Sequence, residues 1–266
     1  MLLNRENIDL PSLWQTVDAL ADAARQETLR HFRHVNLTAE SKKADFDPVT
    51  VADRAAERAM RDVLEELRPQ DSILGEEEEP KIGTSGLTWV LDPIDGTRGY
   101  ISGTPTWGVL IALSDANGPI LGAVDQPYIG ERFYGGPDRA VVVGPQGEAP
   151  LKARETRLLS DATIFTTFPE VGTEADGLAF ARVAERTKLT RYGCDCYAYA
   201  LLAAGQIDLV IEAGLQPYDI QAPIAVVEAA GGIVTDWQGA PAHNGGRAVA
   251  AATPELHAAA LELLNL

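Results

Sequence analysis

The sequence predicts an α/β fold, in the broad sense that includes α+β, with antiparallel strands in one half and alternating strands and helices in the other. Three observations lead to this prediction. Apolar residues first recur at helical spacing, over residues 12–32 and 53–67. Short apolar strands separated by turn residues follow between residues 88 and 143. After residue 157, strand and helix patterns alternate, which is typical of a layered arrangement.

The chain is expected to divide near residue 150 into two halves that share a cleft. Residues 1–150 are predicted to form an N-terminal α+β half, in which two helices pack on an antiparallel sheet that carries most of the candidate metal ligands described below. Residues 151–266 are predicted to form a C-terminal α/β half that closes the cleft. A chain of 266 residues is long enough to bury a large core in either arrangement.

Start and stop signals delimit several of the predicted elements. Pro11-Ser12 precedes the first helix, Asp53 stands at the expected N-cap of the second helix, and Pro69 ends it. In the N-terminal half, strands are expected at residues 88–91, 109–113, 121–124, 131–134 and 140–143. In the C-terminal half, strands are expected at residues 162–166 and 207–211, and helices near residues 175–186, 197–204 and 219–230. Gly231-Gly232 is an expected stop for the last of these helices.

The charge balance excludes several classes of partner. Thirty-nine acidic and 22 basic residues give a formal charge of -17, which repels nucleic acid and anionic membrane surfaces, so neither is expected to bind. Residues 1–13 lack an uninterrupted apolar run, so we predict a cytoplasmic protein without a signal peptide or membrane anchor. Cys194 and Cys196 fit neither a disulfide framework nor a zinc site, and we expect buried or cleft-edge thiols.

The segment from Trp89 to Thr97 is the most informative part of the sequence. A buried strand leads into Asp92, the following proline fixes a turn, and Asp95 comes three residues later, so the two carboxylates are expected to converge. Gly96 allows a close approach to the backbone, and Thr97 can begin the next helix. The amides of these two residues are therefore candidates to cradle a phosphate oxygen.

Three further acidic segments are candidates for the same cleft. Glu76 and Glu77 follow a short apolar pair and a glycine, and their side chains are expected to point into the cleft, whereas Glu78 and Glu79 are expected on a solvated face. The polar segment 42–53 is interpreted as a loop that delivers Asp47 or Asp53 to a metal site, with Thr50 as a hydrogen-bond relay. Asp219 is expected to cap a helix, to bind a cation, or to do both.

These oxygen ligands indicate the chemistry. Hard carboxylate ligands without histidine or thiolate favour Mg²⁺, with Mn²⁺ able to substitute, and disfavour zinc. Two or three such ions would reverse the local charge and activate a water molecule for attack on phosphorus, without a phosphoenzyme. The sequence therefore predicts a magnesium-dependent hydrolase that acts on a small, soluble phosphate monoester.

The four segments together resemble the inositol monophosphatase superfamily, in order and over nearly the whole chain. The most specific part of the resemblance is the run Leu91-Asp92-Pro93-Ile94-Asp95-Gly96-Thr97. The resemblance implies a layered αβαβα sandwich, a homodimer and inhibition by lithium. It also implies that Glu76, Asp92 and the carbonyl of Ile94 hold one ion, that Asp92, Asp95 and Asp219 hold a second, and that Glu76 helps to hold a third. Asp53 and Thr97 match the pair that orients the attacking water, and the amides of Gly96 and Thr97 match the phosphate site.

Other residues resemble the histidinol-phosphate phosphatase branch of this superfamily. They are Gly193-Cys194-Asp195, Tyr218-Asp219-Ile220-Gln221, and the segments 99–108 and 125–132. Histidinol is cationic, so Asp195 and Glu212 are candidates to bind it, and charge-assisted hydrogen bonds of this kind contribute about 1.5–3 kcal/mol each. L-histidinol phosphate, an intermediate of histidine synthesis, is the expected substrate. The alternatives are inositol-1-phosphate or another polyol phosphate, a non-enzymatic regulatory binding protein of the same fold, and, for Asp195, a surface helix cap.

Overall fold

The first half of the chain is a sheet covered on one face by two long helices. The computed structural model describes residues 9–34, 39–41 and 48–266. Helices α1 (Leu10–His31) and α2 (Val51–Leu67) pack together on a seven-stranded sheet with the order β3-β4-β5-β6-β7-β8-β9. Its strands are β3 (Ser72–Gly75), β4 (Thr88–Asp95), β5 (Gly108–Asp115), β6 (Gly118–Gln126), β7 (Glu131–Gly136), β8 (Arg139–Gly144) and β9 (Gly147–Pro150).

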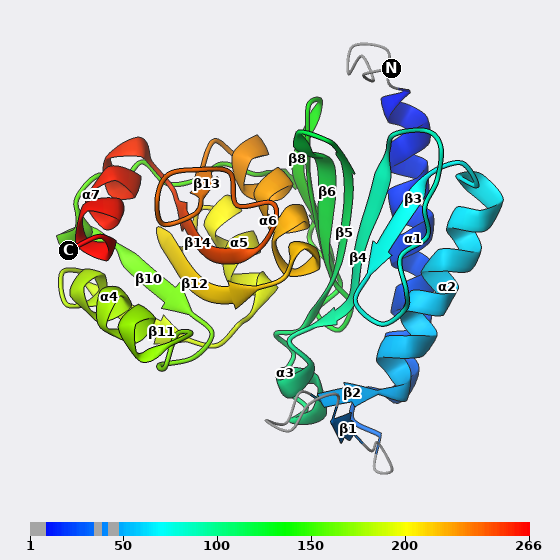
Figure 1. Ribbon diagram of the computed structural model, residues 1–266, viewed down its shortest axis with the longest axis horizontal. Coiled ribbons are helices and arrows are strands. Elements are labelled where there is room, and N and C mark those ends of the chain that lie inside the picture. Colours follow the sequence, from blue (N-terminus) through cyan, green and yellow to red (C-terminus); the bar gives the residue numbers. More distant parts are fainter. Residues whose placement is uncertain (1–8, 35–38, 42–47) are drawn as a thin grey trace.

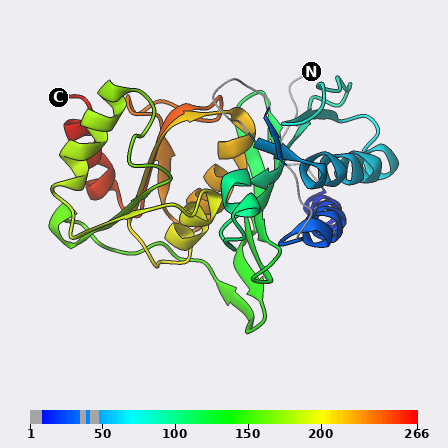
Figure 2. The same ribbon diagram turned by 90° about the horizontal axis from the view of Figure 1, so that it is seen from below.

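The second half contains a smaller sheet with helices on both faces. Its strand order is β11-β10-β12-β14-β13, and the strands are β10 (Thr163–Thr166), β11 (Leu189–Tyr192), β12 (Leu209–Leu215), β13 (Ile233–Thr235) and β14 (Gly246–Ala251). Helices α4 (Glu174–Ala184) and α7 (Pro254–Leu264) lie on its outer face, whereas α5 (Cys196–Ala203) and α6 (Pro217–Ala229) lie between the two sheets (Figures 1 and 2). The layers are therefore αβαβα, as the resemblance implied.

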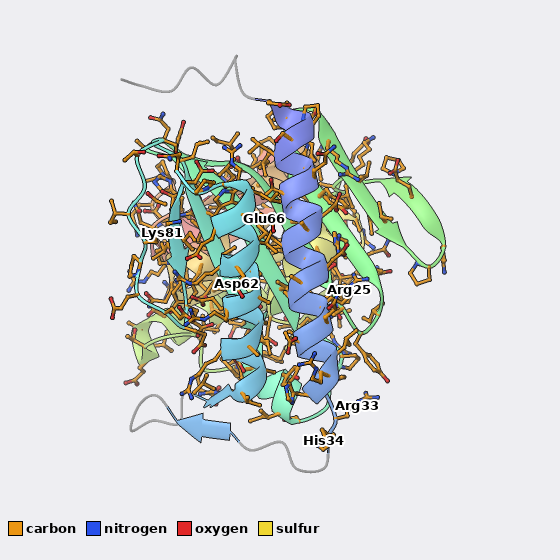
Figure 3. All side chains as sticks on the ribbon, turned by 90° about the vertical axis from the view of Figure 1, so that its right-hand side faces the viewer. Arg25, Arg33, His34, Asp62, Glu66 and Lys81 are labelled. Carbon is orange, nitrogen blue, oxygen red and sulfur yellow. The ribbon has the colours of Figure 1, made fainter. Side chains whose placement is uncertain are left out.

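The cores follow from the amphipathic pattern of the helices. In α2, Ala56, Met60 and Leu64 are buried at helical spacing, while Asp62 and Glu66 lie on the outer face of the helix layer (Figure 3). This apolar stripe packs with α1 against strands β3 to β6. A second core lies between the two sheets and contains most of α5 and α6, and a third lies under α4 and α7.

A buried ion pair joins the first helix to the large sheet. Asp125 of β6 and Arg132 of β7 are register partners, and the Arg132 Nε lies 2.7 Å from the Asp125 Oδ1. Arg25 of α1 approaches the same carboxylate oxygen at 2.6 Å. The segment 125–132 therefore orients α1 on the sheet and lies outside the pocket described below.

Several predictions about local structure need correction. The large sheet is mostly antiparallel, and its edge strand β3 pairs with β4 in parallel. Asp53 and Asp219 are not N-caps: Thr50 and Gln216 hold those positions, and the two aspartates are the third helical residues of their capping boxes. Helix α3 (Thr97–Ile101) begins at Thr97, where a helix start was expected. The unpredicted elements are the 3-10 turn η2 (Leu159–Asp161), β1 (Ala39–Ser41), β2 (Pro48–Thr50), and β9, β11, β13, β14 and α7. No helix within residues 9–34 and 48–266 has the length and apolarity needed to cross a membrane.

Candidate active site

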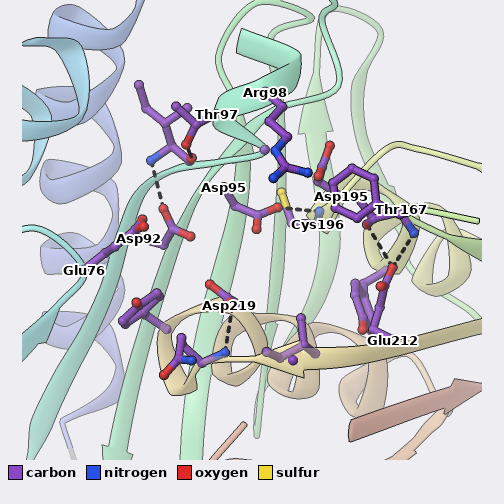
Figure 4. Close-up of a pocket in the computed structure, with 18 of the residues that line it drawn as sticks. Glu76, Asp92, Asp95, Thr97, Arg98, Thr167, Asp195, Cys196, Glu212 and Asp219 are labelled. Atoms are coloured by element: carbon purple, nitrogen blue, oxygen red, sulfur yellow. Dashed lines mark hydrogen bonds between the residues drawn. The ribbon is translucent and has the colours of Figure 1, made fainter. Parts of the chain in front are cut away.

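A polar cavity of about 310 Å³ lies where the two halves meet. It is lined by the end of β4, the start of α3, the start of α5, and the segment from β12 to α6 (Figure 4). Of the residues named from the sequence, the cavity is lined by Glu76, Asp92, Ile94, Asp95, Gly96, Thr97, Asp195, Glu212 and Asp219. The cavity thus brings together residues from both halves.

A bulge in β4 explains how Asp92 and Asp95 face the same point. Side chains three residues apart on a regular strand point to opposite faces of the sheet. Here Asp92 pairs with Leu110 and Asp95 pairs with Gly108, so the β4 strand contains one extra residue between the two aspartates. The Ile94 amide donates to the Asp92 Oδ1 at 2.9 Å and fixes the turn. The extra residue places both carboxylates on the cavity side.

Asp219 completes a three-carboxylate cluster from the opposite half of the chain. Its Oδ2 accepts a hydrogen bond of 2.7 Å from the Gln216 amide, which closes the first turn of α6. Carboxylate oxygens of Asp92, Asp95 and Asp219 lie within 4.8 Å of one another, and no other such group occurs in the described part of the chain. The sequence prediction that these three residues converge is therefore met in the structure.

Three ionised carboxylates so close together, without a cation between them, destabilise the folded protein. Burial raises the pKa of Asp92 well above its usual value, and Glu76, Asp95 and Asp219 raise it further by repulsion. Burial also raises the pKa of Asp95, together with repulsion from Asp195 and Asp219, although the Cys196 amide donates to its Oδ2 at 2.6 Å. A divalent cation among these oxygens would remove the repulsion, and an all-oxygen set is the kind that Mg²⁺ prefers.

Glu76 lies beside Asp92 but outside the three-carboxylate cluster (Figure 4). Glu77 was predicted to point into the cleft, but it does not line the cavity. Glu78 was predicted to be solvated, but its carboxylate pairs with Arg58 at 2.7 Å and lies 3.8 Å from Arg61. Glu79 is exposed, as expected. Tertiary contacts to α2, rather than the acidic run itself, therefore distinguish the four glutamates.

Asp53 lies behind the cavity wall, and its carboxylate contacts Thr97, which lines the cavity. The Thr50 hydroxyl donates to the Asp53 Oδ2 at 2.6 Å, and the Thr97 Oγ1 lies 3.4 Å from the Asp53 Oδ1. The Thr97 hydroxyl is closer to the Ile94 carbonyl oxygen, at 3.1 Å. Asp53 is 1% exposed and does not line the cavity, so its carboxylate contacts the cavity wall only through Thr97. Asp47 lies outside the described residues.

Asp195 lies against the turn that follows Asp95. Its Oδ2 would be 2.8 Å from a Cβ at Gly96, so glycine is needed there for space as well as for its φ of 85°. Asp195 immediately precedes α5 and has a φ of 47°, a costly conformation for a non-glycine residue, and its side chain does not cap the helix. Burial raises its pKa to about 6, although Arg98 opposes this. Neighbouring Cys196 is buried and Cys194 is half-buried, both as free thiols, as expected.

Glu212 faces the same end of the cavity as Asp195. Its carboxylate accepts hydrogen bonds from the amide and hydroxyl of Thr167, at 2.7 and 2.9 Å, and from Thr166 at 3.3 Å. Burial raises the pKa of Glu212 to about 7, the Thr167 hydrogen bonds oppose this, and Asp195 adds repulsion. Two acidic groups beyond the three-carboxylate cluster thus favour a ligand that carries positive charge at this end.

The cavity also contains residues that the sequence did not single out. Arg98 and Phe168 line its mouth, with the guanidinium carbon 4.8 Å from the centre of the ring. Tyr199 lines its inner part, and its hydroxyl is buried with no hydrogen-bond partner among the residues that the structure describes. Phe168 and Tyr199 sit within or beside apolar runs, where an aromatic residue usually belongs to the core. Only the position of Arg98 after Thr97 was a usable signal.

Comparison with known proteins places the chain in a family. The model of the inositol monophosphatase family matches residues 11–265. The chain belongs to this family. Its members, including the relatives below, are phosphatases, and dependence on Mg²⁺ is general among them.

Three relatives illustrate the spread within the inositol monophosphatase family. The chain is 41% identical to the chloroplastic bifunctional phosphatase IMPL2 of Arabidopsis thaliana, over 93% of this chain and 73% of the relative. It is 36% identical to the histidinol-phosphatase of Streptomyces coelicolor, over 92% of this chain and 94% of the relative. The structure of an inositol monophosphatase from Zymomonas mobilis superposes with a TM-score of 0.84 and 35% identity, covering 98% of this chain and all of the other.

Proposed function

We propose that the protein hydrolyses L-histidinol phosphate to L-histidinol and phosphate in the presence of Mg²⁺. The observation that carries this proposal is the position of Asp195, which lies in the same cavity as the three-carboxylate cluster, together with Glu212. One end of the cavity suits cations that bind phosphate, and the other suits a cationic alcohol. The similarity to a histidinol-phosphatase supports the same substrate.

The metal end is assigned to residues of β4 and its neighbours. We assign Asp92, Asp95 and Asp219 to one ion, and Glu76, Asp92 and the Ile94 carbonyl to another, with Glu76 contributing to a weaker third. When bound, Mg²⁺ or a substituting Mn²⁺ neutralises the phosphate and lowers the pKa of a water molecule. The backbone amides of Gly96 and Thr97 are assigned to the phosphate oxygens.

Thr97 and Asp53 are assigned to the attacking water. Asp53 is fixed by the amide and hydroxyl of Thr50, at 2.9 and 2.6 Å, and is shielded from solvent. When the Thr97 hydroxyl donates to Asp53 instead of the Ile94 carbonyl, its lone pairs can accept a hydrogen bond from a water molecule on the cavity side. This arrangement orients the water for attack, because Asp53 cannot move without breaking the start of α2.

The alcohol end is assigned to Asp195 and Glu212. Glu212 is buried, Asp195 is half-buried, and both have a raised pKa, so an ammonium or imidazolium group that enters the cavity stabilises the ionised carboxylates. A neutral polyol provides hydrogen bonds but no such compensation. The two carboxylates therefore favour histidinol over inositol as the alcohol.

The test is the substitution Asp195→Ala, measured on L-histidinol phosphate and on inositol-1-phosphate with saturating Mg²⁺. The loss of one charge-assisted hydrogen bond is expected to raise KM for histidinol phosphate about tenfold or more, with little change for inositol phosphate. Asp161→Ala, which removes an exposed charge outside the cavity, is the control and is expected to behave as wild type. Equal effects of Asp195→Ala on both substrates would contradict the assignment.

Inositol-1-phosphate is the second candidate substrate, because the Zymomonas mobilis inositol monophosphatase superposes over its full length. A panel of histidinol phosphate, inositol-1-phosphate, adenosine 3′,5′-bisphosphate and fructose-1,6-bisphosphate separates the candidates by kcat/KM. The expected order places histidinol phosphate first. A higher kcat/KM for inositol-1-phosphate would favour the second candidate, and a higher value for a bisphosphate would contradict both.

A further inference from the structure

A buried glutamate lies directly beneath the loop that carries Glu76. Glu57 is on α2, in the outer helix layer, and is 0% exposed. Its Oε2 accepts the Glu77 amide at 2.7 Å, and its Oε1 accepts the Glu78 amide at 3.1 Å. One carboxylate thus holds two consecutive backbone amides immediately after Glu76.

The charge of Glu57 is balanced within the same helix. Arg61, one turn later, contacts the Glu57 Oε1 through its Nη2 at 2.8 Å and its Nε at 2.9 Å. The Arg61 Nη2 also donates to the Glu78 carbonyl oxygen at 3.1 Å. Glu57 and Arg61 therefore hold the loop through both its amides and a carbonyl, so its backbone path is strongly constrained.

Gly75 leaves the space that the Glu57 carboxylate occupies. A Cβ at Gly75 would lie 2.1 Å from the Glu57 Oε1 and 2.7 Å from its Oε2. Because the carboxylate is held by two amides and an arginine, it cannot move aside without breaking those bonds. Only glycine therefore leaves room for the Glu57 carboxylate at position 75, the residue before Glu76.

We propose that Glu57 is a positioning residue for metal binding. By fixing the backbone at residues 77 and 78, it aims the Glu76 side chain into the cavity beside Asp92. The proposal rests on the proposed function, since it takes Glu76 as a ligand. It assigns the outer helix α2 a part in ion affinity although Glu57 does not line the cavity.

Binding of Mn²⁺ to the purified full chain, followed by electron paramagnetic resonance, tests this role. In Glu57→Gln, an amide group must face either the Glu77 amide or the Arg61 side, so at least one hydrogen bond is lost. Mutation of residues that support metal ligands without touching the ion typically lowers metal affinity 10- to 100-fold. We therefore expect Glu57→Gln to bind Mn²⁺ about tenfold more weakly than wild type. The rate at saturating Mg²⁺ should stay near the wild-type value, so that the Mg²⁺ requirement changes more than kcat.

Asp208→Asn is the matched control. Asp208 is also fully buried, accepts the Thr163 amide at 2.7 Å and pairs with Arg154 at 3.2 Å, but it does not line the cavity. This variant is expected to lose stability and keep wild-type Mn²⁺ affinity. A loss of affinity in Asp208→Asn as large as that in Glu57→Gln would overturn the proposal, because general destabilisation would then explain both.

Gly75→Ala gives an independent variant that leaves Glu57 and Arg61 in place, and it decides the question if Glu57→Gln does not fold. It is expected to weaken Mn²⁺ binding by a similar factor. If wild type binds Mn²⁺ tightly and the folded Glu57→Gln and Gly75→Ala variants bind it equally well, the positioning role of Glu57 is overturned but the proposed function is not. A wild-type protein that binds no Mn²⁺ would overturn the proposed function and this role with it.

Discussion

The two halves of the molecule contribute to the cavity in different ways. In the N-terminal half, Glu76, Asp92, Asp95 and Thr97 lie within one short stretch of sequence, at the ends of the neighbouring parallel strands β3 and β4. In the C-terminal half, Asp195 immediately precedes α5, Glu212 lies on β12 and Asp219 lies on α6. On the proposed assignment, most of the groups that act on phosphate come from the first half. The second half adds Asp219 to them and provides Asp195 and Glu212, which are proposed to select the alcohol.

The largest expected effect is the loss of kcat on substitution of Asp92, in the N-terminal half. Asp92→Asn removes a charge assigned to two ions and is expected to lower kcat at least about a thousandfold on every substrate, which corresponds to about 4 kcal/mol. The raised pKa of Asp92 means that its ionisation destabilises the folded protein at neutral pH when no cation is present. In EDTA the variant should therefore melt at the wild-type temperature or above. Retained turnover would contradict the proposed assignment.

A smaller and selective effect is expected on the C-terminal side. Glu212→Gln keeps the shape and one acceptor for the Thr167 amide but removes the charge. KM for histidinol phosphate should rise about tenfold while kcat changes little, because one charge-assisted hydrogen bond is lost. Steady-state kinetics on histidinol phosphate and inositol-1-phosphate provide the measurement. A fall in kcat of equal size on both substrates would instead place Glu212 with the residues that act on phosphate.

The smallest effect is expected at Tyr199. Its buried hydroxyl lacks a partner among the described residues, so Tyr199→Phe removes an unsatisfied polar group and should leave the free energy of unfolding unchanged or raise it by about 1 kcal/mol. Thermal melting measures this, and kcat/KM on both substrates is expected to stay within about twofold. A fivefold rise in KM for histidinol phosphate would show that the hydroxyl contacts the alcohol. Tyr199 would then join Asp195 and Glu212 among the residues that select the substrate.

The sequence predicted most of the fold and the convergence of the acids, because long amphipathic helices and strand-end carboxylates have local patterns. It did not predict β9 or β11, which are short edge strands with mainly exposed residues, or β14, which is rich in alanine and lacks an alternating pattern. It also misjudged Glu77 and Glu78, because contacts with Glu57, Arg58 and Arg61 on a distant helix decide their positions. Burial of Asp53 behind Thr97 depends on tertiary packing in the same way.

The double use of Asp219 has a consequence for how relatives of this chain can diverge. One oxygen of its carboxylate closes the first turn of α6, and the side chain also belongs to the three-carboxylate cluster. An asparagine would preserve the helix start while discarding the negative charge, so a lineage could abandon hydrolysis without losing its architecture. In relatives that keep the hydrolytic chemistry, we therefore expect an acid at position 219. In relatives that keep only the fold, we expect any residue whose side-chain oxygen can accept the amide at position 216.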